Sequence, residues 1–290
     1  MLLALVIMWG SAFMFTKIAV EYVPPLLVVA GRMTVAAIVI GLFIVFTRRR
    51  LTLTRPIIVF AIVVALLGNL FPFFLISWGQ QVVDSGLAGI LMAFIPLMTM
   101  VLSHYYLDDE PLHLMRILSF LAGVSGVALL LGPSVVLTFE GHTSLFLSML
   151  AIVLATLFYS ISIIVSRRRP KVGAVESSAL VMWVAVALVS PLAWVEMQTL
   201  DLNLDLAWPS LLAVLTLGIF STALPAIVYF RLIDRTGPNF IALMNYMIPV
   251  WAVLMGVVFL DERFEWHHLF ALCLIITGLA LSNRRRIRQT

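Results

Sequence analysis

The sequence predicts an all-α membrane protein of ten transmembrane helices, arranged as two inverted five-helix repeats. Three observations lead to this fold class. Hydrophobic residues make up 63% of the chain and charged residues only 11%, which lies far outside the composition of soluble proteins. The apolar residues gather in stretches of membrane-spanning length, and the two halves of the chain repeat one another. We therefore expect a polytopic protein with internal symmetry.

The repeat is clearest between Gly68–Asp109 and Ser221–Glu262, which match at a constant offset of 153 residues. The matched positions include Pro72 with Pro225, Pro96 with Pro249, and Leu107-Asp108-Asp109 with Leu260-Asp261-Glu262. A fixed offset over this length indicates two homologous halves, which we place at residues 1–140 and 141–290. Repeats of this kind in an apolar chain are typical of transporters.

Each expected helix is an apolar stretch of about 20 residues, the length that crosses a bilayer core of about 30 Å. The connections between the stretches are short and rich in Pro, Gly and charge, as at Gly132-Pro133, and none is long enough for a soluble domain. The ten expected helices are Leu2–Val20, Pro25–Phe46, Ile57–Trp78, Ser85–Tyr105, Met115–Leu131, Ser144–Val165, Val175–Glu196, Trp208–Phe230, Pro238–Leu260 and His267–Ser282.

The basic residues set the expected orientation. Of the 18 Lys and Arg residues, 15 follow even-numbered helices, whereas the odd-numbered connections hold only Arg263. The positive-inside rule then places both termini in the cytoplasm of a multi-pass inner-membrane protein. Because five helices are an odd number, the second half must insert in the opposite direction to the first. The basic clusters are explained by topology, so no nucleic-acid partner is expected.

Four prolines inside apolar stretches are predicted to bend their helices: Pro72, Pro96, Pro225 and Pro249. A proline inside a helix leaves one carbonyl without its hydrogen bond. In a membrane this is tolerated where neighbouring helices or a water-lined cavity satisfy the group. We expect these helices to line the interior. The alternative is a kink that serves packing alone.

Polar and aromatic side chains deep in the stretches are the candidates for a substrate site, because such groups usually face the interior of a helix bundle. Helix-to-helix hydrogen bonding is the alternative for the amides, and ordinary packing is the alternative for the rings. The candidates are Trp9, Asn69, Trp78, Tyr159, Asn245 and Tyr246.

Lys17 and Arg32 are the two bases placed inside apolar stretches. Each is expected within about 10 Å of the outer surface, counting about 1.5 Å per residue. One interpretation is interfacial anchoring by side chains that snorkel to the surface, with Glu21 as a partner. The other is that both line an outer vestibule, where they attract a carboxylate or another anionic group.

Several function classes are disfavoured by what the sequence lacks. No carboxylate is expected near the midplane, which argues against proton-coupled exchange of cationic drugs. No phosphate loop, nucleophile elbow or zinc spacing is present, so we expect neither an enzyme nor a cofactor nor a metal site. The single cysteine, Cys273, lies in an apolar stretch and is interpreted as a packing residue.

Several short motifs occur in both halves and at the chain's start. They are Trp9-Gly10-Ser11-Ala12-Phe13 followed by Lys17, Pro25 and Arg32 with Ala36-Ala37, Gly86-Leu87-Ala88 through Pro96 to Leu107-Asp108-Asp109-Glu110, Pro249 to Leu260-Asp261-Glu262-Arg263, Gly123-Val124-Ser125-Gly126, and Thr277-Gly278-Leu279. With these motifs the whole chain resembles EamA-type members of the drug/metabolite transporter superfamily. It departs from them at Asp109-Glu110, where the family more often has Gly-Glu.

The resemblance implies ten helices around a central cavity and export of amino acids or related metabolites. The aromatic content favours an exporter similar to the bacterial aromatic amino acid exporters. The expected partners are a small-molecule substrate and the lipid bilayer, with the protein as a monomer or homodimer. Two alternatives stay open: a broad exporter of drugs or amines, and an integral membrane enzyme that acts on lipid substrates.

Overall fold

The structure is a computed structural model that describes residues 1–49, 51, 53–106, 114–139, 143–167, 170, 172–199, 204–228 and 244–283. The first acidic motif, at residues 107–110, lies outside the described residues, as do the end of the eighth expected helix, at residues 229–230, and the start of the ninth, at residues 238–243. The helices are α1 Leu2–Ala19, α2 Pro25–Phe46, α3 Arg55–Ala65, η1 Leu66–Leu70, α4 Phe71–Gly79, α5 Ser85–Met92, α6 Ile95–Tyr106, α7 Leu114–Phe139, α8 Thr143–Arg167, α9 Ala174–Gln198, α10 Leu204–Gly218, η2 Ile219–Ala223, α12 Met244–Leu260 and α13 Trp266–Asn283.

The described residues form helices and no strand. They contain eight segments long and apolar enough to cross a membrane, together with two shorter apolar helices. The predicted all-helical, multi-pass membrane fold is confirmed. One boundary is wrong: Gly132-Pro133 was expected to end the fifth helix, but α7 continues to Phe139. A helix satisfies most of its own backbone hydrogen bonds, whereas an open loop leaves many of them unpaired. In an apolar setting, a helix with one proline is therefore less costly than a loop.

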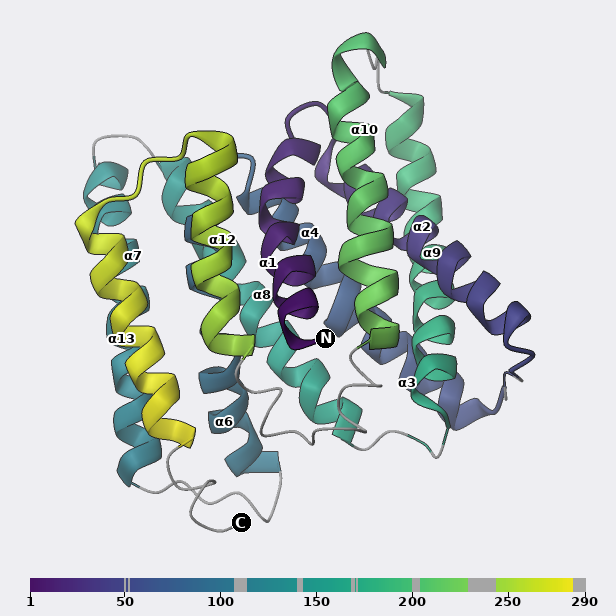
Figure 1. The fold of residues 1–290 in the computed structure, drawn as a ribbon, viewed down its shortest axis with the longest axis horizontal. Helices are drawn as coiled ribbons and strands as arrows, with labels where there is room; N and C mark the ends of the chain where they lie inside the picture. Colours follow the sequence, from purple (N-terminus) through teal and green to yellow (C-terminus); the bar gives the residue numbers. More distant parts are fainter. Residues whose placement is uncertain are drawn as a thin grey trace.

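The helices form two lateral bundles with α1, α4 and α8 between them (Figure 1). In one bundle α13 packs on α7, beside α12 and α6; in the other, α2 packs on α9, beside α10 and α3. The central helix α1 contacts α12, α10 and α5, and α8 contacts α4, α6 and α7. Each lateral bundle therefore combines helices from the first and second halves of the sequence, so neither half has a core of its own.

The corresponding helices α7 and α13 pack in antiparallel directions through glycines. A methyl group added at Gly278 would lie 2.5 Å from the Ser119 carbonyl oxygen, and one added at Gly126 would lie 2.7 Å from Ile275 Cγ1. The contact moves forward along α7 as it moves back along α13. Close approach without a side chain is the usual role of glycine between membrane helices.

Two five-residue π-helical segments interrupt the long third and eighth helices. They are η1 and η2, and they begin at Leu66 and Ile219, separated by the 153-residue offset of the repeat. The Asn69 amide donates to the Val64 carbonyl at 3.2 Å. The Thr222 hydroxyl donates to the Leu217 carbonyl at 2.9 Å. Each side chain reaches the carbonyl five residues back, and π segments of this kind often lie at functional sites.

The backbone is irregular just before three of the four prolines. Pro72 and Pro225 follow η1 and η2, and a turn at residues 93–94 separates α5 from α6 just before Pro96. By contrast, α12 continues as one helix through Pro249. A lone proline costs a helix one hydrogen bond, and here the rest of α12 stays helical around it.

Candidate functional site

The side chain of Arg32 lies inside the helix bundle, with 7% of the residue exposed. Its Nε donates to Thr222 Oγ1 at 2.7 Å, and Nη2 donates to the Ser221 carbonyl at 3.3 Å. Its guanidinium carbon lies 3.7 Å from the centre of the Phe73 ring. Interfacial anchoring is therefore wrong for Arg32. Two hydrogen-bond acceptors on η2 and the face of an aromatic ring stabilise the cation inside the bundle. A side chain that snorkelled to the lipid surface would meet only headgroups there.

Close contact between α2 and α10 makes these bonds possible. A methyl group added at Gly218 would lie 2.5 Å from Val35 Cβ and 3.1 Å from the Arg32 carbonyl, and one added at Gly31 would lie 2.7 Å from Val214 Cγ1. Glycines on both helices thus bring the two backbones together beside Arg32. The distance from α2 to η2 is then short enough for direct hydrogen bonds.

Tyr159 joins the same cluster from α8. Its ring lies edge-on to Phe73 with 6.1 Å between centroids, and the Phe73 ring in turn lies against the Arg32 guanidinium. The structure thus brings together two of the predicted residues, Arg32 and Tyr159. Thr222 and Phe73 were not among the site residues predicted from the sequence. A signal for Thr222 was present, because it occupies the position that matches Asn69 across the repeat.

The other predicted residues on the first-half helices have separate surroundings. Lys17 donates to the Val83 carbonyl at 3.1 Å, so it does not share partners with Arg32. The Asn69 amide donates to the Val64 carbonyl of its own long helix, and its role in substrate binding stays a prediction. The Trp78 residue is 38% exposed, at the end of α4.

The predicted residues near α12 form a third group. Trp9 packs against Leu5, Val6 and Met244, whereas Asn245 and Tyr246 are half-buried at the start of α12. Their roles in substrate binding stay predictions.

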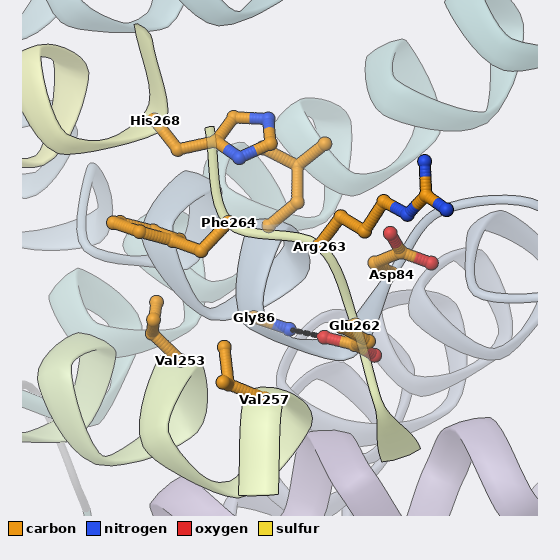
Figure 2. Close-up of a pocket in the computed structure, with 9 residues that line it drawn as sticks. Asp84, Gly86, Val253, Val257, Glu262, Arg263, Phe264 and His268 are labelled. Carbon is orange, nitrogen blue, oxygen red and sulfur yellow. Dashed lines mark hydrogen bonds between the residues drawn. The ribbon is translucent and has the colours of Figure 1, made fainter. Parts of the chain in front are cut away.

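A second polar site joins α12 to α5 through the carboxylate of Glu262. This carboxylate accepts hydrogen bonds from the backbone amides of Ser85 at 2.6 Å and Gly86 at 2.9 Å. Figure 2 shows it facing Gly86, with Asp84 and Arg263 nearby. A carboxylate at a helix N-terminus satisfies amides that lack partners and interacts favourably with the helix dipole. We call this contact of Glu262 with Ser85 and Gly86 the carboxylate clamp.

Two polar contacts between helices, the carboxylate clamp and an ion pair between α2 and α9, each directly follow a residue with left-handed backbone. Asp261 has φ of 53° at the end of α12, directly before Glu262, and Arg48 has φ of 50° at the end of α2. The next residue, Arg49, pairs with Glu176 near the start of α9 at 2.9 Å. A left-handed residue ends a helix and reverses the chain. Here it directs the following side chain toward the N-terminus of the neighbouring helix.

The carboxyl group of Asp84, beside the clamp, gives a pH prediction. Burial raises its pKa above the usual 3.8, and the nearby Glu262 charge adds to this, while Lys17 opposes it. The folded protein therefore binds this proton more tightly than the unfolded chain, so stability falls as pH rises from about 3.8 through the raised pKa. We expect Asp84→Asn to raise the thermal midpoint at neutral pH. Below pH 4 the gain should vanish, and an equal gain at both pH values would contradict this account.

Comparison with known proteins decides the family. The model of the EamA-like transporter family matches residues 1–132 and 146–284. This chain belongs to the EamA-like transporter family. The predicted resemblance is thereby confirmed. The general function of this EamA-like protein is transport across a membrane.

Relatives of this EamA-like protein align over nearly their whole length. The transporter YoaV of Bacillus subtilis is 21% identical, and the match covers 99% of this chain and 98% of YoaV. The inner membrane transporter YedA of Escherichia coli is 27% identical, with 96% and 90% covered. Protein PagO of Salmonella typhimurium is 24% identical, with 94% and 88% covered. A crystal structure 21% identical to the chain superposes with a TM-score of 0.63 over 99% of it and 96% of that chain, which shows a shared fold.

Proposed function

We propose that this EamA-like protein is an inner-membrane secondary transporter that exports amino acids or related small metabolites by alternating access. The observation that carries the proposal is the Arg32 cluster, a buried cation among Thr222, Phe73 and Tyr159 within the helix bundle. Ionisable residues inside membrane helices are costly to bury and usually mark a path for substrate or ions. Packing alone does not require a guanidinium at this place.

The proposed architecture has ten spans, formed by inverted repeats at residues 1–140 and 141–290, with both termini in the cytoplasm. Three observations support it: the antiparallel packing of α7 on α13, the matched positions of η1 and η2, and the Arg49–Glu176 pair that joins the end of α2 to the start of α9. In an inverted repeat, corresponding helices run in opposite directions and bind substrate where the halves meet.

In this scheme the two lateral bundles rock about the Arg32 cluster. The π segments and the four prolines supply the places where helices bend, and the carboxylate clamp closes the outer side of the site. Lys17, which bonds to Val83 near the clamp, belongs to this outer closure. Trp9, Trp78, Asn69, Asn245 and Tyr246 remain proposed substrate contacts.

The test is efflux of radiolabelled amino acids from proteoliposomes that contain the purified full chain. We expect efflux above that of empty liposomes, and a loss of efflux in Asn245→Ala and Trp78→Ala variants that keep the wild-type thermal midpoint. Cys273→Ala, at an exposed residue on α13, is the matched control and should transport normally. Absence of efflux for every amino acid would overturn the proposed cargo, and normal efflux by both variants would remove Asn245 and Trp78 from the site.

A further inference from the structure

The positive charge of Arg32 is buried without a counter-charge. Arginine presents five N–H donors, and the structure assigns Nε to Thr222 and one hydrogen of Nη2 to Ser221. Both acceptors are neutral. Within the described part of the chain, no carboxylate lies within ion-pair distance of the guanidinium. Buried charges in proteins are normally paired, because an unpaired ion in an apolar interior is expensive.

The partners of Arg32 occupy its Nε and Nη2, and within the described part of the chain Nη1 has no hydrogen-bond acceptor. The Thr222 hydroxyl donates its proton to Leu217, so its lone pairs face Arg32 Nε. The Phe73 ring covers one face of the plane. A guanidinium held in this way is pre-organised for an oxyanion, because its remaining N–H groups lie in one plane and form parallel bonds to two oxygens.

We propose that Arg32 and Tyr159 form the carboxylate-binding subsite of the transporter, so that its cargo is a small carboxylic acid, such as an amino acid, rather than an amine. This inference rests on the proposed function and deepens it. The carboxylate supplies the missing negative charge and accepts N–H groups of Arg32, and the Tyr159 hydroxyl donates a further hydrogen bond. A cationic amine meets the same fixed positive charge and is repelled.

The experiment compares ligands that differ only in this group. Purified wild-type protein in a neutral detergent is titrated with benzoate and benzamide, lactate and lactamide, and L-phenylalanine and L-phenylalaninamide, and binding is followed by thermal shift. Loss of one charge-assisted interaction costs about 1.5 to 3 kcal/mol, so the acid of at least one pair should bind roughly 10 to 100 times more tightly than its amide. Equal binding within every pair, or no binding by any acid, overturns the subsite.

Variants locate the effect at Arg32. Arg32→Gln should abolish the preference for the acid, Arg32→Lys should retain part of it because the charge stays, and Tyr159→Phe should weaken it. Arg49→Gln is the control, since Arg49 is an exposed cation paired with Glu176 outside the site, and it should keep the preference. A preference that survives Arg32→Gln places the carboxylate elsewhere. If Arg32→Gln does not fold, the Arg32→Lys and Tyr159→Phe titrations decide the matter, and wild-type preference in both overturns the assignment.

Two further measurements distinguish a soluble cargo from a bound lipid, and binding from transport. Addition of phosphatidylglycerol tests whether an anionic lipid headgroup occupies the subsite, and loss of acid binding in its presence, without loss in phosphatidylcholine, overturns a soluble cargo. Efflux from proteoliposomes separates this inference from the proposed function. Acid-selective binding without efflux leaves the subsite in place and removes the transport proposal, whereas efflux of acids and amides at equal rates does the reverse.

Discussion

Glu262→Ala is expected to lower the free energy of unfolding by about 3 to 6 kcal/mol. The variant removes two hydrogen bonds to a charged acceptor, each worth about 1.5 to 3 kcal/mol, and leaves the amides of Ser85 and Gly86 without partners at the start of α5. Glu262→Gln keeps one oxygen acceptor but loses the charge and turns its NH2 group toward the second backbone amide, so its cost should be about 1.5 to 3 kcal/mol, smaller than that of Glu262→Ala. Thermal unfolding of the purified protein measures both.

The matched control for the clamp is Glu265→Ala. Glu265 lies on the same connection, its side chain is largely exposed, and its ion-pair partner is His267. Exposed ion pairs contribute little, so this variant should stay within about 0.5 kcal/mol of wild type. If Glu262→Ala and Glu265→Ala unfold at the same temperature, the clamp does not hold α12 against α5.

Thr222→Val should lower the free energy of unfolding by about 1 to 3 kcal/mol. It leaves the buried Arg32 Nε donor without its 2.7 Å acceptor and takes the hydrogen-bond donor away from Leu217. A charged donor that loses its partner keeps its desolvation cost. The measurement is again thermal unfolding, combined with the affinity for the acids named above.

Thr222→Ser separates the hydroxyl from the side-chain volume. It retains the oxygen that accepts from Arg32 and the proton that reaches Leu217, so stability and acid binding should both stay close to wild type. A second control is Thr216→Val, because Thr216 bonds only to Leu212 on the exposed side of α10 and should tolerate the change. Equal stability of Thr222→Val and Thr222→Ser would show that the hydroxyl does not hold Arg32.

The membrane helices could be predicted because length and apolarity alone decide whether a segment crosses a bilayer. Arg32 and Tyr159 could be selected as site candidates for a related reason, because polar groups are rare in such segments; their role in binding stays a prediction. Thr222 was not selected because its bond to Leu217, five residues back, belongs to a π segment and does not follow the helical period of 3.6. Nothing local distinguishes it from a threonine that bonds within an ordinary helix.

Contacts between residues far apart in the chain could not be predicted from the sequence pattern. The acidic motif at Leu260-Asp261-Glu262 was recognised as a shared feature of the halves, but its partner lies 177 residues away, at Ser85. A carboxylate after a helix can meet any exposed amide, and only the packing of α12 on α5 selects one. The Gly132-Pro133 prediction failed for the opposite reason, since a strong local signal was overruled by the continuing helix α7.

The π segment η1 also sets the direction in which the side chains of the following helix, α4, point around the helix axis. A π turn closes its hydrogen bonds one residue further along the chain than an α turn does, and an α-helix rotates by about 100° per residue. Shortening Leu66–Leu70 by one residue into an ordinary helical turn would swing α4 through about that angle, and the Phe73 ring would leave the guanidinium face of Arg32. The contact of Phe73 with Arg32 thus depends on the extra residue that η1 contributes one turn before Phe73.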